Sequence, residues 1–186
     1  MTLNEALEKI KQLIPYYNQY TYWKQMSEVW MKQCMEYNIP SPPQVIKTID
    51  AQQVIKLYTD FFPDLMNNLN AIMKIYDNEF EVTTISDVLR FVEWDKTNFN
   101  PYDLKAFDCD DFAAHLWGNF ACYGWSALPV SLLVGQIYGA SHAICSVIAC
   151  PSETEPEKIY FIEPQNDTII REVDIDKKLL ATVVFH

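Results

Sequence analysis

The apolar residues of this 186-residue chain change their spacing near Gly124, and this change constrains the fold more than any other feature. Before that glycine, apolar residues mostly recur every three or four positions, which is typical of helices. After it come short β-branched runs separated by polar or Gly/Pro segments, which is typical of strands. Because 49% of the residues are hydrophobic, the chain can bury a full core. The order predicts an α+β protein.

Helices are predicted where apolar stripes are bounded by capping residues, glycine or proline, over about residues 3–14, 23–37, 50–61, 65–76, 86–93 and 109–123. Asp50 is the candidate cap of the third of these helices. Strands are predicted over 128–137, 142–149, 158–162, 168–173 and 181–185, forming a mostly antiparallel sheet. We therefore expect a helical N-terminal region over 1–94 and an α+β core over 95–186.

Composition narrows the classes of function. The net charge of −11 and the pI near 4.6 predict no nucleic-acid partner, since such affinity comes from Lys and Arg. No apolar run approaches the roughly 18 residues that cross a bilayer, and the start of the chain resembles no signal peptide, so we expect a cytoplasmic protein without membrane contact. The five cysteines, an odd number without CxxC spacing, predict reduced thiols, and we expect no metal or cofactor.

One thiol stands among acids in the stretch FDCDDFAAHL, at the predicted start of the last helix. Asp108 is a candidate N-cap, and Asp110 and Asp111 suit the first turn, where backbone N–H groups are free. A cysteine of ordinary pKa, about 8.5, is only a few per cent thiolate at neutral pH. Because the acids disfavour the thiolate further, Cys109 is a credible nucleophile only beside an imidazolium.

Among the three histidines, His142 is the best candidate for that partner, because it opens a strand just after the small residues Gly139, Ala140 and Ser141. The polar segment 150–157 reads as a hairpin loop between this strand and the next. Symmetric pairing about the loop places position 164 or 165 opposite His142 and brings Glu163 within reach of the imidazole. Gln165 shares the face of Glu163 and is a second candidate.

Together these residues resemble the transglutaminase-like superfamily of the papain-like cysteine-protease fold, especially its bacterial cysteine peptidases. The resemblance lies in the segments Asp108–Ala113, Gly139–Ala143 and Ile162–Pro164, and it covers about residues 98–167. It implies a papain-like core in which a catalytic helix packs on the sheet.

The resemblance also implies a triad of Cys109 as nucleophile, His142 as base and Glu163 as orienting carboxylate, where the family usually has Asp. Such a triad performs acyl transfer on an amide bond, as a peptidase, amidase, deamidase or transglutaminase acting on a protein or peptide. Backbone N–H groups at the helix start are the expected oxyanion donors. Trp94, Asn98 and Asn100 are upstream candidates for a side-chain donor.

Two alternatives from other classes stay open. The cluster of Asp108, Asp110 and Asp111 permits a divalent-metal enzyme, since carboxylate oxygens suit Mg²⁺. A binding module that retains the fold without turnover is the other alternative. Its aromatic run over residues 16–23 can stack on sugar rings or on a protein partner. The sequence leaves the substrate and the oligomeric state undecided.

Overall fold

The computed structural model describes residues 39–65, 71–122 and 124–185. The chain divides into two compact units, 1–39 and 40–186, and the account below concerns the second. The helices predicted over 3–14 and 23–37 and the aromatic run over 16–23 lie outside the described residues.

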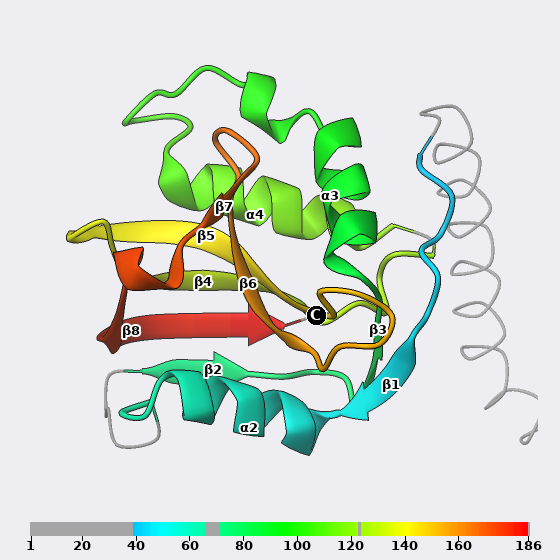
Figure 1. Cartoon of the computed structure of the whole chain (residues 1–186). Coiled ribbons are helices and arrows are strands. Elements are labelled where there is room, and N and C mark those ends of the chain that lie inside the picture. Colours follow the sequence, from blue (N-terminus) through cyan, green and yellow to red (C-terminus); the bar gives the residue numbers. More distant parts are fainter. Residues whose placement is uncertain (1–38, 66–70, 123, 186) are drawn as a thin grey trace, which may run out of the picture. The chain divides into compact units, whose positions relative to one another are not determined.

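Strands dominate the second unit (Figure 1), in which three α-helices accompany eight strands in the described part of the chain. In chain order the elements are β1 (Lys47–Asp50), α2 (Ala51–Phe61), β2 (Ile72–Lys74), β3 (Glu79–Val82), α3 (Ile85–Trp94), the 3-10 turn η1 (Thr97–Phe99), α4 (Cys109–Phe120), β4 (Val130–Ile137), β5 (Ala140–Ala149), β6 (Lys158–Glu163), β7 (Thr168–Ile170), the 3-10 turn η2 (Glu172–Asp174) and β8 (Ile175–Phe185).

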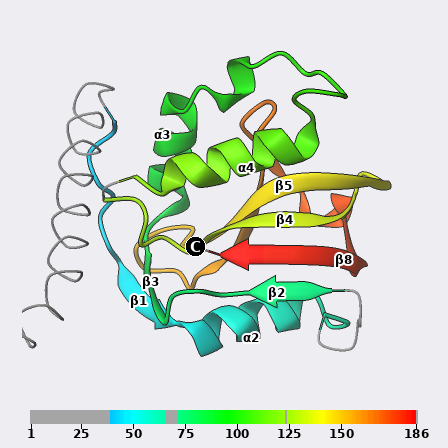
Figure 2. The same cartoon turned by 180° about the vertical axis from the view of Figure 1, so that it is seen from behind.

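Six of these strands form one sheet in the order β2-β8-β4-β5-β6-β7 (Figures 1 and 2). Neighbouring strands run antiparallel, except that β2 lies parallel to β8. A separate two-stranded sheet pairs β1 with β3. The central strand β5 continues the register of β4 through a two-residue turn and pairs on its other side with β6.

Helices cover both faces of β5, and period-2 alternation assigns its side chains to one face or the other. On one face the Cys145 thiol donates to the Ala113 carbonyl of α4 at 3.3 Å. On the other, the Tyr58 hydroxyl of α2 hydrogen-bonds to Ser146 at 2.8 Å and to Ser131 at 3.2 Å. Burial raises the pKa of Tyr58 to about 12. A strand covered on both faces is buried along most of its length, as β5 is.

Each helix begins at a residue whose side chain accepts a free backbone N–H. Asp50 caps α2 by accepting from Gln53 N at 2.8 Å, as the sequence predicts. Thr84 caps α3, and Asp108 caps α4 together with Asp111 in a capping box. The helix predicted over 86–93 is confirmed as α3.

The predicted fold class is wrong, because strands dominate the described residues and three of them, β1, β2 and β3, lie in the region that was expected to be helical. Residues 72–74 form β2 and 79–82 form β3, whereas helical spacing predicts a helix over 65–76. Ile72 and Met73 pair instead with Thr182 and Val183 of β8, and this long-range pairing outweighs the local apolar spacing. The expected division of the chain into regions 1–94 and 95–186 stays a prediction.

Candidate functional site

His142 and Glu163 form a hydrogen-bonded pair where β5 and β6 diverge. The His142 Nε2 lies 2.7 Å from Glu163 Oε2, and the two side chains are 18% and 7% exposed. The last β5–β6 pair is Cys145 with Ile162, so the continued register places position 165 opposite His142 and Glu163 diagonal to it. The contact that hairpin symmetry predicts is therefore confirmed.

Glu163 is fixed from two sides. Its Oε2 faces His142, and its Oε1 accepts from the backbone N–H of Gln165 at 3.3 Å. Gln165 therefore contributes its main chain here. A buried carboxylate with these bonds holds the imidazole in one tautomer, with the proton on Nε2. His142 Nδ1 is then an acceptor at a partly exposed position.

An exposed aromatic residue lies at the tip of the β4–β5 hairpin, which carries His142. Tyr138 and Gly139 join β4 to β5 with φ values of 56° and 77°, the left-handed pair typical of a tight hairpin. Tyr138 is 58% exposed. Its pKa is raised, first by desolvation and then by the negative charges of Glu163 and Asp174. The phenol therefore lies within electrostatic reach of Glu163.

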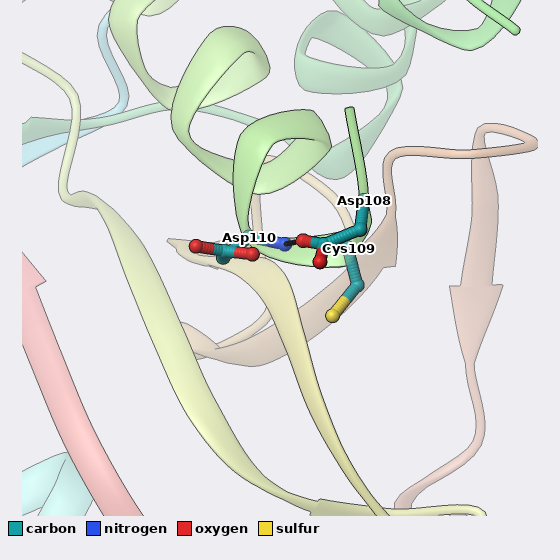
Figure 3. A group of neighbouring side chains, drawn as sticks. All are labelled: Asp108, Cys109 and Asp110. Carbon is teal, nitrogen blue, oxygen red and sulfur yellow. Dashed lines mark hydrogen bonds between the residues drawn. The ribbon is translucent and has the colours of Figure 1, made fainter. Parts of the chain in front are cut away.

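The acidic start of α4 is occupied largely with capping. Asp108 Oδ1 accepts from Asp110 N at 3.4 Å, and Asp111 Oδ2 accepts from Asp108 N at 3.2 Å. Asp108, Cys109 and Asp110 place their ligand atoms within 4.8 Å of one another in the first turn (Figure 3). The side chain of Asp108 raises the pKa of Asp110. Asp108 and Asp111, two of the three carboxylates of the metal-binding alternative, thus already cap the helix.

Cys109 begins α4 and is partly exposed. In the described part of the chain, no hydrogen bond joins its sulfur to His142, whose ring is bonded to Glu163. Helix α4 packs against β5, the strand that carries His142. The structure thus brings His142 and Glu163 together and leaves the proposed roles of Cys109, Asp108, Asp110, Asp111 and Gln165 as predictions.

Sequence reasoning missed a second polar pair at the turn between β6 and β7. Asn98 Nδ2 donates to Asp167 Oδ2 at 2.6 Å, although the two residues lie 69 positions apart. Asp167 has a positive φ of 60° and its N–H bonds to the Glu163 carbonyl at 2.9 Å. The Asn166-Asp167 turn dipeptide was the available signal, but nothing local links it to Asn98.

Comparison with known proteins bears on the fold. No family model matches the sequence, and no curated protein matches it. Among solved structures, a complex of PSL1a with E64 aligns with a TM-score of 0.56 and 22% identity over 74% of this chain and 50% of that one. Polyporus squamosus lectin bound to the epitope Neu5Aca2-6Galb1-4GlcNAc aligns with a TM-score of 0.57 and 21% identity over 74% and 49%. The fold is shared with a lectin structure. The chain spans about half the length of these proteins.

These neighbours overturn the transglutaminase-like identification, and with it the papain-like core and the enzyme assigned from the triad. The short motifs that carry the resemblance also have structural explanations. Asp108 and Asp111 form a capping box, and His142 and Glu163 form a cross-strand pair. The expected protein or peptide substrate stays a prediction.

Among the described residues, no helix is both long and apolar enough to cross a membrane.

Proposed function

We propose that residues 40–186 form a non-catalytic carbohydrate-binding module whose site includes His142, Glu163 and Tyr138. One observation carries the proposal: a polar pair, bonded at 2.7 Å and mostly buried, lies on a hairpin whose tip carries an exposed aromatic side chain. Ligand sites are built from a few fixed polar groups set among apolar or aromatic surface. The fold shared with a glycan-bound lectin supports the same function.

Each of the three residues has a separate task. Glu163 orients the imidazole and keeps its proton on Nε2, so that Nδ1 accepts a hydrogen bond from a sugar hydroxyl. Tyr138 offers an aromatic face to the C–H groups of the sugar ring, and its hydroxyl is a further donor. The site is fixed in advance of binding, which lowers the entropy lost on association.

Calorimetric titration of the full chain against a panel of glycans, including the trisaccharide of the lectin complex, tests this function. We expect saturable binding of at least one glycan. His142→Ala should weaken it about tenfold, the effect of one lost hydrogen bond of about 1.4 kcal/mol.

Tyr138→Asn is a variant that tests the aromatic contact without straining the turn, because asparagine tolerates positive φ and Asn-Gly is favoured in such hairpins. The matched control is Tyr76→Asn, which removes another tyrosine that is 68% exposed. We expect weaker binding from the first variant and unchanged binding from the second.

Two results would contradict the proposal. One is the absence of binding to every glycan in the panel. The other is a covalent adduct of E64, the compound solved with PSL1a, that forms on the wild-type chain but not on Cys109→Ala, because it would show a reactive thiol at α4.

A further inference from the structure

A pocket borders the turn between β6 and β7, which follows Glu163 of the candidate site. It has a volume of about 470 Å³, within the range of small-ligand sites. Its lining comes from the end of α3, the turn η1 and the β6–β7 turn: Leu89, Val92, Glu93, Lys96, Asn98, Phe99 and Asp167. The pocket therefore combines apolar, aromatic and polar groups on three segments.

Asn98 holds an acceptor that lacks a donor. Its Nδ2 donates to the Asp167 carboxylate at 2.6 Å, which fixes the orientation of the amide, since the reverse orientation would place two acceptors together. Among the described residues, no donor reaches the buried Oδ1 of Asn98. Buried polar atoms are normally paired, so the unpaired Oδ1 is an unusual feature of a residue that lines the pocket.

The segment that carries Asn98 is anchored to α4. Asp95 accepts from Thr97 N at 2.8 Å and from Asn119 Nδ2 at 2.6 Å. The Thr97 hydroxyl also bonds to His115 Nδ1 at 2.8 Å. These bonds make the pocket wall a preformed surface, as a binding site requires.

Phe99 supplies an aromatic wall. It is 73% exposed, although the ammonium of Lys96 lies 5.2 Å from the ring centroid. An exposed phenylalanine in a pocket wall offers apolar area to the C–H face of a ring-shaped ligand. Lys96 adds a donor at the same rim.

The charges select against an anion. Glu93 and Asp167 line the pocket with one cation, Lys96. Burial raises the pKa of Asp167 to about 6. The negative charge of Asp95 adds to the shift, while Lys96 opposes it. With more carboxylates than cations, the pocket disfavours a ligand carboxylate.

We infer that the pocket between Asn98, Phe99 and Asp167 binds the ring of a neutral hexopyranoside, with sugar hydroxyls bonding to the polar side chains of Asn98 and Asp167 and the ring packing on Phe99. This inference rests on the proposed carbohydrate-binding function and adds a second subsite to it. The Asp167 N–H to Glu163 carbonyl bond joins the two subsites through one turn.

NMR titration of the full chain with the methyl glycosides of glucose, galactose and mannose tests the pocket. Glucuronic acid and glucosamine serve as the anionic and cationic counterparts. We expect a neutral glycoside to shift the side-chain amide signal of Asn98. Phe99→Ala should weaken its affinity about tenfold, whereas Leu104→Ala, which truncates an apolar side chain that is 74% exposed, should leave it unchanged.

Asn98→Ala, paired with Asn78→Ala as control, tests the contribution of the Asn98 side chain to sugar binding. If it unfolds the chain, Phe99→Ala decides, because an exposed ring contributes little to folding. Sugar binding that shifts only signals around His142 and survives Phe99→Ala would overturn the pocket and leave the proposed function standing. Stronger binding of glucuronic acid or glucosamine would overturn the neutral ligand. Absence of binding by any sugar would overturn both proposals.

Discussion

The start of α4 and the turn between β6 and β7 are both rich in carboxylates, but their hydrogen bonds differ in kind. At α4, Asp108 and Asp111 accept backbone N–H groups of their own helix. At the turn, Glu163 and Asp167 form hydrogen bonds with side chains from distant segments, His142 and Asn98. The first pattern is what any helix start needs, whereas the second fixes polar groups at a surface. The comparison indicates that long-range polar pairs mark the site better than acid density does.

The largest effect we expect is a difference in the free energy of unfolding between variants of the two regions. His142→Ala leaves the buried Glu163 without its side-chain partner, and should lower the free energy of unfolding by about 2–3 kcal/mol. Asp110→Asn, at an exposed position of α4, should change it by less than about 0.5 kcal/mol. Urea unfolding measures both. Equal losses would remove the distinction between the regions.

The capping role at α4 predicts a smaller effect. Asp108→Ala should lower the free energy of unfolding by about 1 kcal/mol, and Asp108→Asn by only a few tenths, because asparagine also caps helices. Thermal unfolding of both variants at one pH provides the measurement. A loss in Asp108→Asn as large as in Asp108→Ala would mean that the charge, rather than the cap, matters there.

At the turn between β6 and β7, Asp167 should make the stability of the fold depend on pH. Its pKa is raised to about 6, mainly by burial and then by Asp95, while Lys96 opposes the shift. Between the unfolded value near 4 and about 6, the folded state holds more protons, so stability from this group falls as pH rises through that window. The difference in unfolding free energy between Asp167→Asn and wild type, followed from pH 4 to 7, isolates the slope. A flat difference would contradict the burial.

The smallest effect concerns the reactivity of the thiol at α4. Cys109 is only partly exposed, so iodoacetamide should label it a few-fold more slowly than it labels a free thiol such as glutathione. Burial raises the pKa of the Cys145 thiol strongly, so that residue should label only on unfolding. Peptide mass spectrometry separates the two sites. Labelling of Cys109 faster than glutathione would indicate activation by a nearby base.

Local signals predicted local structure well. The caps at Asp50 and Asp108 lie where the sequence places them, since capping depends on neighbours within three residues. Hairpin symmetry also predicted the contact of His142 with Glu163, because one loop sets the register of both strands.

The features that the sequence did not predict depend on partners far along the chain. Nothing near Ile72 announces its pairing with Thr182, so helical spacing misassigned that strand. The bond between Asn98 and Asp167 likewise has no local signature. The resemblance to transglutaminase-like proteins rested on short motifs that capping and strand pairing also produce.

Parallel glycan titrations of the wild type, His142→Ala and Cys109→Ala test the central claim most directly, with the reaction mixtures checked for released product. The account predicts that the wild type and Cys109→Ala bind the same glycan with affinities within about twofold, that His142→Ala binds about tenfold more weakly, and that the ligand is recovered unchanged. Turnover by the wild type that Cys109→Ala lacks would contradict it.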